Sequence, residues 1–304
     1  MSKSIQVQAV NKLTLQGKLL DVNLGSGKLS DGRPYERATV TIRTTQTYGG
    51  KTETSEIPVG MFATEFTSTG KPNPAWKSIQ DLKEMKTIQN NGINEADTVR
   101  LTGASLQENN FVSRNNGQLI NGWQIRGSFV NRANGVPDAA TFATEIYIMS
   151  MDDEFDKDGE TTGRMVIKGG IVQYGGKLDV VKFIVENPDT IDYISRHWEV
   201  NKTLTVKGYI RVTSIEVKPS AESSGWGEDI PEGPTTQFIR ELIVTKGDDE
   251  PKEDEFAYDP TEIKKAFNER KAYIEQLQID ARKKANGAAP ATGTAGSKKY
   301  DWEG

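Results

Sequence analysis

The sequence of 304 residues contains no cysteine and a single histidine, His197. The absence of cysteine excludes disulfide scaffolds, thiolate zinc sites and cysteine nucleophiles. One histidine leaves little material for imidazole-based catalysis. No apolar run approaches the roughly 18 residues of a membrane-spanning helix, and residues 1–6 lack the apolar stretch of a signal peptide. We therefore expect a soluble protein of a reducing cytoplasm that is not an enzyme and carries no metal or cofactor.

Charge is unevenly distributed along the chain. The formal net charge is −5, yet residues 1–140 hold 16 Lys and Arg against 12 Asp and Glu, whereas residues 141–304 hold 22 against 31. A basic first half is compatible with a polyanionic partner, which the overall charge conceals. The alternative is an asymmetry of a size that many soluble proteins acquire by chance.

A strand-like phrase, in which glycine is set among alternating apolar residues, recurs along the chain. Its copies are residues 13–19, 99–103, 165–169 and 204–208. Glycine inside a strand is costly unless the backbone bends sharply or another segment crosses close to it, as happens in a small coiled barrel. Because the phrase occurs twice in each of two blocks, the sequence predicts two such barrels.

The order of elements is the same in both blocks. The first block shows five strand-like segments, with a short helical pattern at residues 75–82 before the fourth. The second repeats this order, with a capped helix start at residues 187–194. Five strands with a helix before the fourth is the order of the OB fold. We predict a mainly β protein of two tandem OB-fold barrels, in domains at residues 1–138 and 139–247.

The C-terminal region, residues 248–286, is predicted to be an acidic linker followed by an amphipathic helix. Asp259, Pro260 and Glu262 form a helix-start pattern. The apolar residues expected on one face, which would dock on the rest of the protein, are Ile263, Phe267, Ile274, Leu277 and Ala281. Residues 287–304 have too little apolar content to fold and are predicted to be a flexible tail. Its aromatic and acidic tip, with Tyr300 and Trp302, is a candidate for binding a protein partner.

The segment Gly25-Ser26-Gly27-Lys28 has the composition of a phosphate-binding loop without its spacing. That motif needs a glycine where this chain has Val22, and Ser or Thr where it has Leu29. A helix should also follow, and none is predicted. We therefore do not assign nucleotide binding to this segment.

An exposed barrel face can bind an oligonucleotide when side chains stack on bases and cations contact phosphates. Alternation over residues 37–43 directs Ala38, Val40 and Ile42 to the core, so Arg37 and Arg43 point outward. In the fifth strand Trp123 is assigned to the core, which leaves Arg126 on the other side. The proposed nucleic-acid site in the first block is Arg33, Tyr35, Arg37, Arg43, Tyr48, Lys51, Trp76, Lys77 and Arg126.

These candidates share a chemical logic. Tyr35, Tyr48 and Trp76 are expected off the core side, each near a cation, so that a ring and a charge are presented together. For each ring the alternative is an ordinary half-buried surface aromatic. In the second block, Lys207, Tyr209 and Arg211 alternate with apolar residues and are expected to share an outward face.

Residues 11–19 resemble the first strand of single-stranded DNA-binding proteins, and residues 37–43 resemble their second strand. The tandem arrangement is similar to that of replication proteins of large bacteriophages. This resemblance implies a protein that coats and protects single-stranded DNA during replication, recombination and repair, in the host cytoplasm if phage-encoded. It also implies recruitment of partners through the C-terminal tail. The tip departs from the bacterial family, which ends in Ile-Pro-Phe.

Two other interpretations stay open. The first is a structural β-module of a virion or another assembly, which would form a stable homo-oligomer indifferent to DNA. The second is an OB module that binds a protein or a carbohydrate, in which charge reversal at Arg37 and Arg43 would leave ligand binding unchanged.

Overall fold

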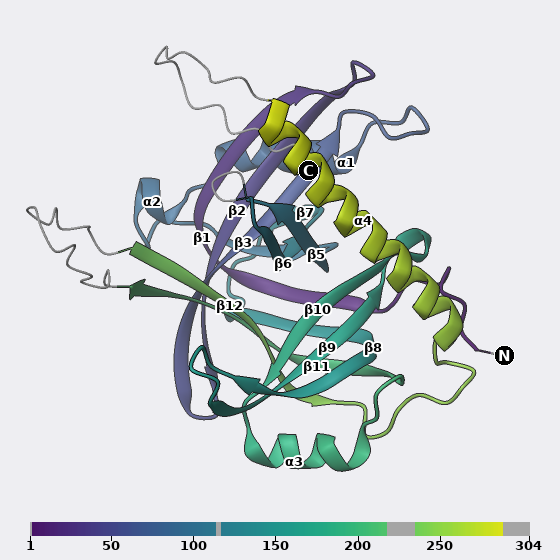
Figure 1. The fold of residues 1–304 in the computed structure, drawn as a ribbon. Helices are drawn as coiled ribbons and strands as arrows, with labels where there is room; N and C mark the ends of the chain where they lie inside the picture. Colours follow the sequence, from purple (N-terminus) through teal and green to yellow (C-terminus); the bar gives the residue numbers. More distant parts are fainter. Residues whose placement is uncertain (1, 114–116, 218–234, 288–304) are drawn as a thin grey trace, which may run out of the picture.

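The computed structural model describes residues 2–113, 117–217 and 235–287, whose strands form two barrels joined in one twelve-stranded sheet (Figure 1). The predicted tail, with Tyr300 and Trp302, lies outside the described residues. Within the described residues, no helix has the length and apolar character needed to cross a bilayer.

The first barrel is a closed ring. Its strands are β1 (Asn11–Lys28), β2 (Pro34–Tyr48), β3 (Lys51–Thr64), β4 (Thr98–Thr102), β5 (Ser105–Val112), β6 (Leu119–Arg126) and β7 (Phe129–Arg132). β1, β2 and β3 form an antiparallel meander, and β3 pairs in parallel with β6. The fourth and fifth strand positions are each divided, so that β4 pairs with β7 and β5 with β6. Pairing of β4 with β1 closes the ring.

The second barrel repeats this connectivity without the divisions. Its strands are β8 (Ala139–Phe155), β9 (Thr161–Val172), β10 (Leu178–Val185), β11 (Thr203–Val217) and β12 (Thr235–Gly247). β8, β9 and β10 form the meander, β10 pairs in parallel with β12, and β11 pairs with both β12 and β8. Both rings are five-stranded Greek-key barrels, which confirms the prediction of two OB folds.

The two barrels share main-chain hydrogen bonds. The first part of β1, Asn11 to Gln16, pairs with Ala139 to Thr144 at the start of β8. From Leu15 onward β1 pairs with β4, and from Lys18 onward with β2, inside the first barrel. β1 therefore belongs to one barrel along most of its length and is an added strand on the other.

Two of the strand glycines lie where another segment crosses close by. A Cβ atom at Gly17 would collide with the carbonyl oxygen of Arg43, and one at Gly208 with that of Ile243. No side chain fits at either position, because the obstacle is backbone that other pairings hold in place. These close approaches are the physical reason for glycine in two of the four copies of the phrase.

A helix precedes the fourth strand of each barrel. These helices are α1 (Pro74–Asp81) and α3 (Pro188–His197), and the shorter turns are η1 (Leu82–Glu84), α2 (Ile88–Asn91) and η2 (Tyr174–Gly176). The Asn73 side chain accepts a hydrogen bond from the Ala75 amide at 3.1 Å, and Asn187 caps α3 in the same way. Each helix buries one isoleucine, Ile79 or Ile194, in the adjoining core.

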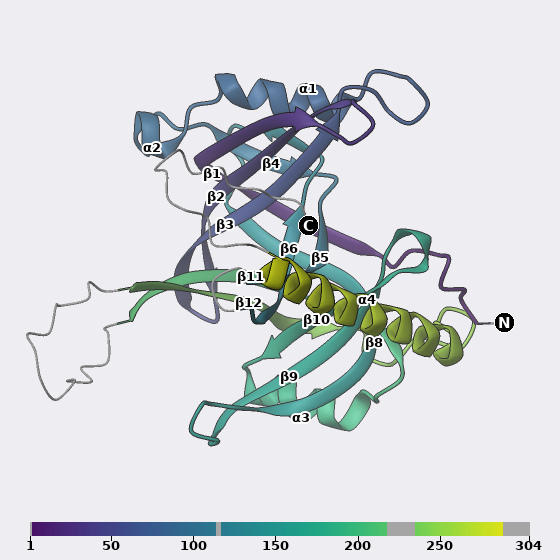
Figure 2. The ribbon, with the colours of Figure 1, turned by 45° about the horizontal axis from the view of Figure 1, so that its top comes forward.

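The last helix, α4 (Pro260–Gly287), runs across the outside of the barrels and packs against β5 and β10 (Figures 1 and 2). Asp259 accepts a hydrogen bond from the Thr261 amide at 2.7 Å, which confirms the predicted helix start. Ile263 and Ala266 are buried, and Arg270 forms a bidentate ion pair with Glu108 of β5. The first half of the helix is therefore docked.

The second half of α4 is more open. Tyr273 and Ile279 are 59% and 44% exposed, while Ile274, Leu277 and Ala281 on the predicted apolar face are half-buried. The predicted apolar face is thus buried at Ile263 and Ala266 and only partly covered along the second half of the helix.

Candidate nucleic-acid interface

The outer side of the first barrel carries two neighbouring aromatic rings. Alternation along β2 places Tyr35 and Arg37 outside, and alternation along β3 does the same for Phe62, because Met61 and Ala63 are buried. The registers put Tyr35 opposite Thr64 and Arg37 opposite Phe62. The rings of Tyr35 and Phe62 are 5.2 Å apart between centroids, and Phe62 is 50% exposed.

The floor beneath these side chains is glycine. Gly27 and Gly25 of β1 pair with Tyr35 and Arg37. A Cβ atom at Gly27 would lie 2.6 Å from the Tyr35 hydroxyl oxygen, and one at Gly25 would lie 2.8 Å from Arg37 Nε. Both side chains therefore lie flat across β1, which a larger residue would prevent. The glycines that suggested a phosphate loop serve a packing role instead.

Arg126 extends this surface onto β6. It pairs with Gly60 of β3, and its guanidinium lies across that glycine. Among the described residues it makes no side-chain hydrogen bond or ion pair. Burial lowers the pKa of Arg126 from its ordinary value, although the group stays charged. A partly desolvated cation without an anion is suited to a phosphate. We call Tyr35, Arg37, Phe62 and Arg126 the outer track.

The β5–β6 hairpin continues the same side of the sheet. Phe111 and Ile120 are cross-strand partners on the side that carries Arg126, and they are 47% and 39% exposed. Loops and hairpins around an OB barrel commonly contact oligonucleotides. The hairpin thus adds an apolar extension to the outer track.

Several other predicted residues stand apart from the outer track. Arg33 lies in the turn between β1 and β2 and bonds Asp31 at 2.7 Å, and this contact lowers the pKa of Asp31. Arg43 is on the outer side of β2, with Nε 4.0 Å from a Glu56 carboxylate oxygen. Trp76 of α1 packs half-buried against the core. The remaining cations are exposed: Lys51 at the β2–β3 tip, Lys77 on α1 and Lys207 on β11.

Two predicted rings meet in a contact between the barrels. Tyr48, at the end of β2, stacks on Tyr209 of β11 with centroids 3.9 Å apart and planes 9° from parallel. The prediction that Tyr48 lies off the core side is wrong, because it has the parity of Val40 and Ile42. The β2–β3 hairpin extends beyond its own barrel, and its inner side packs on the second one.

The prediction that Lys207, Tyr209 and Arg211 share an outward face is wrong for two of them. Tyr209 is 5% exposed, and the Arg211 side chain is 14% exposed. Tyr209 and Arg211 do lie on one face of β11, but the β2–β3 hairpin of the first barrel covers that face. A register shift between Lys207 and Gly208 also interrupts the alternation.

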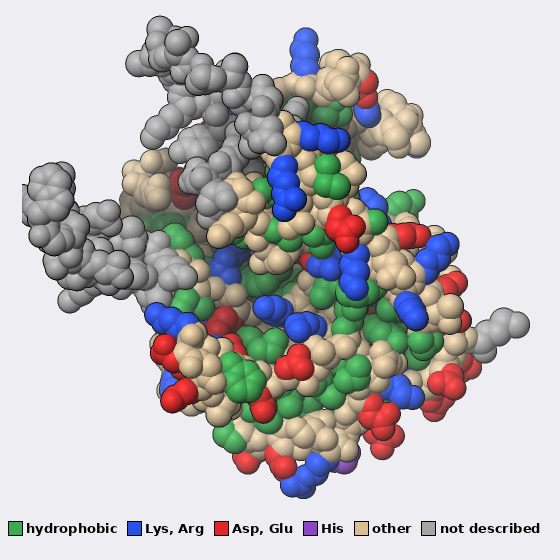
Figure 3. Space-filling view, viewed as in Figure 1, with side chains coloured by type: hydrophobic (Ala, Val, Ile, Leu, Met, Phe, Trp, Pro, Cys, Tyr) green, Lys and Arg blue, Asp and Glu red, His purple; other side chains and the backbone are tan. Residues whose placement is uncertain are grey.

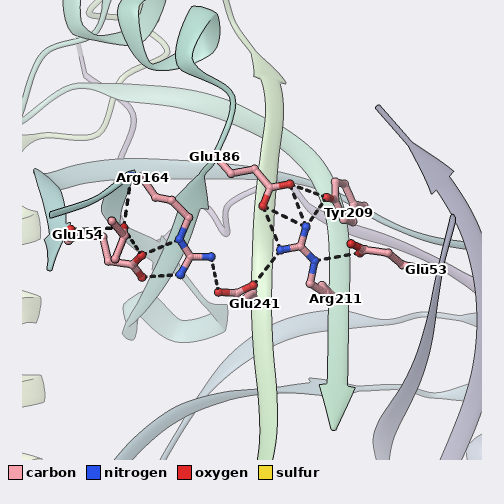
Figure 4. A network of polar contacts seen from close by, with 8 residues as sticks. Glu53, Glu154, Arg164, Glu186, Tyr209, Arg211 and Glu241 are labelled. Carbon is pink, nitrogen blue, oxygen red and sulfur yellow. Dashed lines mark hydrogen bonds and ion pairs between the residues drawn. The ribbon is translucent and has the colours of Figure 1, made fainter. Parts of the chain in front are cut away.

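Arg211 is the centre of a network that joins the barrels (Figure 4). Its guanidinium contacts Glu53 of β3 at 2.9 Å, Glu186 at 2.9 Å and Glu241 at 3.1 Å. Burial, followed by the hydrogen bond to Glu186, raises the pKa of Tyr209, so its hydroxyl remains a donor. Burial alone would raise the pKa of Glu186, but hydrogen bonds from Arg211 lower it. The charges of Arg211, Glu53, Glu186 and Glu241 are therefore paired within the protein.

The exposed apolar part of the site was missed by reasoning from sequence. Phe62 could have been found, since Val59, Met61 and Ala63 have strand alternation and leave Phe62 outside. Phe111 and Ile120 lie at the far end of a divided strand pair, which sequence gives no means of placing. The assignment of Trp123 to the core is confirmed, since it is 8% exposed.

Charge is grouped on the face drawn in Figure 3. Basic side chains lie across the middle of this face, while acidic ones gather around the second barrel and the segment that leads into α4. Within the described residues, no group of three or more His, Cys, Asp or Glu side chains is arranged to hold a metal ion.

Solved structures with a similar fold include a single-stranded DNA-binding protein from Thermus aquaticus. It is 10% identical, with a TM-score of 0.50, over 81% of this chain and 95% of that one. A deletion mutant of that protein is 12% identical, with a TM-score of 0.45, over 81% of this chain and 97% of that one. A small single-stranded DNA-binding protein from Streptomyces coelicolor, also 12% identical, has a TM-score of 0.24 and covers 41% of this chain and 96% of its own.

At these identities the likeness is one of fold. A search of curated proteins found no match. The model of one protein family, YorF, matches residues 9–280, which is most of the chain. The chain belongs to the YorF family.

Proposed function

We propose that this protein binds single-stranded DNA along the outer track of the first barrel. The observation that carries the proposal is the pair of adjacent rings, Tyr35 and Phe62, beside Arg37 and beside Arg126, which has no side-chain partner among the residues that the structure describes. Each stacked base could contribute about 1–3 kcal/mol, and each arginine could contact one phosphate. The fold shared with the Thermus aquaticus protein supports the same proposal.

The track is suited to an unpaired strand. Bases in a duplex are stacked on each other and cannot place their faces on protein rings, whereas a single strand offers every base face. The Tyr35 ring lies flat over Gly27 and the Phe62 ring is half exposed, so a base can meet an open ring face. Sequence preference is expected to be weak, because stacking and phosphate contacts do not read base edges.

The wider role that we propose is coating and protecting single-stranded DNA during replication, recombination and repair, as in bacteriophage replication proteins. The tail with Tyr300 and Trp302 would recruit partners, and the chain would act as a binder and not as an enzyme, in the cytoplasm of the host. The proposed division is residues 1–138, 139–247, 248–286 and 287–304. The family resemblance described above supports this role.

The test is a titration of the full chain with oligo-dT, a duplex of the same length and the corresponding RNA, at two salt concentrations. Tryptophan fluorescence or anisotropy reports binding. We expect tight binding of the single strand that weakens steeply as salt increases, because phosphate contacts release counterions. Absence of binding, or binding that does not respond to salt, would contradict the proposal.

A further inference from the structure

Arg240 of β12 lies in the junction between the barrels and has no anionic partner in the described part of the chain. Its guanidinium is 4.7 Å from the centre of the Trp123 ring, which β6 of the first barrel supplies. Its Nε atom is buried and has no hydrogen-bond acceptor. Burial lowers the pKa of Arg240 from its ordinary value. The residue as a whole is of intermediate exposure, so it is not sealed from solvent.

The neighbouring arginines are different. Arg164 bonds Glu154 and Glu241, Arg211 bonds three carboxylates, and Arg270 bonds Glu108. The protein therefore has carboxylates available close to this junction, yet none lies within ion-pair distance of Arg240 among the described residues. A buried charge is normally paired, and one that is not paired is held at a cost in stability. Such a cation is suited to an anion that arrives from outside.

Only strand β6 separates the contact between Trp123 and Arg240 from the outer track. β6 pairs with β3 only at Ile125 and Arg126 in the described part of the chain, so the edge of β6 from Leu119 to Gln124 is free of β3. Arg126 is on one side of β6, and Trp123 with Arg240 is on the other. A polynucleotide that follows the track past Arg126 can cross this edge.

Phe238, two residues before Arg240 on β12, carries an exposed aromatic ring. Phe238, Arg240 and the buried Leu242 alternate onto one side of the strand. Past the barrel this side is no longer covered, and Phe238 is 60% exposed. A cation on an aromatic ring, followed by a second open ring, repeats the chemistry of the outer track.

We propose that Arg240 is a second phosphate-binding position, where a strand that has followed the outer track crosses β6 and continues onto the β11–β12 ribbon, with Phe238 stacking the next base. This inference rests on the proposed function and extends it from one barrel to the junction of both. In this proposal the second barrel contributes to DNA binding through the paired strands β11 and β12. Its face with Tyr209 and Arg211, which the first barrel covers, does not contact DNA.

The test compares Arg240→Met with Arg196→Met across a series of oligo-dT lengths. Methionine keeps contact with the Trp123 ring without the charge, and Arg196 is an exposed arginine on α3, paired with Asp192, whose replacement makes the same change in net charge. For long oligonucleotides we expect Arg240→Met to weaken binding about tenfold. The dependence of log K on log salt should decrease by about 0.7, as for one lost phosphate contact.

Short oligonucleotides that fill only the outer track should bind both variants like the unmodified protein, and Arg240→Lys should retain part of the affinity for long ones. The melting temperature of free Arg240→Met should stay equal or increase, because an unpaired buried charge has been removed. A lower melting temperature would indicate a structural role and overturn the inference. Equal binding of the Arg240 and Arg196 variants at every length would overturn it while leaving the proposed function intact. Failure of the unmodified protein to bind any oligonucleotide would contradict both this inference and the proposed function.

Discussion

The two barrels have the same strand framework, but their outer faces differ in exposure and in the pairing of their charges. In the first barrel, Phe62 is half exposed and Arg126 has no partner among the described residues. In the second, Tyr209 is buried under Tyr48, and three carboxylates surround Arg211. The outer face of one OB barrel therefore stays open, while the other uses the same types of side chain to hold its neighbour.

The difference arises from the length of one hairpin. β2 and β3 continue past their own barrel to a tip at Gly49 and Gly50, both with positive φ. The inner side of this extension brings Tyr48 and Glu53 onto the second barrel. There the Tyr48 ring stacks on Tyr209 and the Glu53 carboxylate contacts Arg211, so these two side chains are engaged within the protein. A ring next to an arginine in the sequence is thus insufficient to mark a ligand surface.

The largest effect is expected on the covered side. Arg211→Ala leaves Glu53, Glu186 and Glu241 close together without their shared cation. We expect the free energy of unfolding to decrease by about 2–4 kcal/mol, below the cost of a fully buried pair because two of the carboxylates are partly exposed. Chemical denaturation measures this, with Arg196→Met as the control. Unchanged stability would show that the network does not hold the barrels together.

On the open side, Phe62→Ala should weaken binding of oligo-dT by about 1–3 kcal/mol, through loss of one stacking surface. Its melting temperature should change little, because Phe62 is already half exposed. The matched control is Phe155→Ala, a ring 62% exposed at the end of β8 in the second barrel. Equal affinities of the two variants would argue against the outer track.

A smaller effect separates the cations of the two faces. Arg126→Met should reduce the slope of log K against log salt by about 0.7, as expected for one phosphate contact to a single strand. Lys168→Met makes the same charge change on the outer side of β9, where Lys168 lies 3.5 Å from Asp152. That variant should keep the unmodified slope. The same loss in both would indicate a general charge effect.

The smallest effect concerns another contact between the barrels. Asp179 of β10 accepts a hydrogen bond from the Glu108 amide of β5 at 3.0 Å, and burial raises its pKa. In the pH range between the ordinary and the raised pKa, the folded state binds more protons than the unfolded chain. Stability therefore decreases as pH rises through that range. Asp179→Asn should remove this decrease, as measured by melting temperatures across pH 4 to 7, and an unaltered profile would contradict it.

The architecture was predictable from sequence because its signals are local. Strand alternation, Gly49-Gly50 at a hairpin tip and the Asp259 helix start each report on a few adjacent residues. The recurrence of this local order gave two barrels. The division of the fourth strand into β4 and β5 was not predicted, because the break near Gly103 depends on packing inside the ring.

The candidate site was predictable only in part, because exposure depends on contacts distant in sequence. Alternation correctly placed Arg37 and Arg126 outside, whereas Tyr35, expected in a loop, lies within β2. It failed for Tyr209, whose cover comes from a residue about 160 positions earlier in the chain. Parity states which side of a strand a residue occupies, but not what lies on that side.

The pairing of β1 with β8 has a mechanical consequence. Separating the barrels would break a ladder of backbone hydrogen bonds along six residues of each strand, so no hinge lies between them. The molecule should melt as one cooperative unit, and neither half should persist when the other is cut away. A polynucleotide bound to such a body would take its curvature from the protein, and the number of nucleotides that one molecule covers would be fixed in advance.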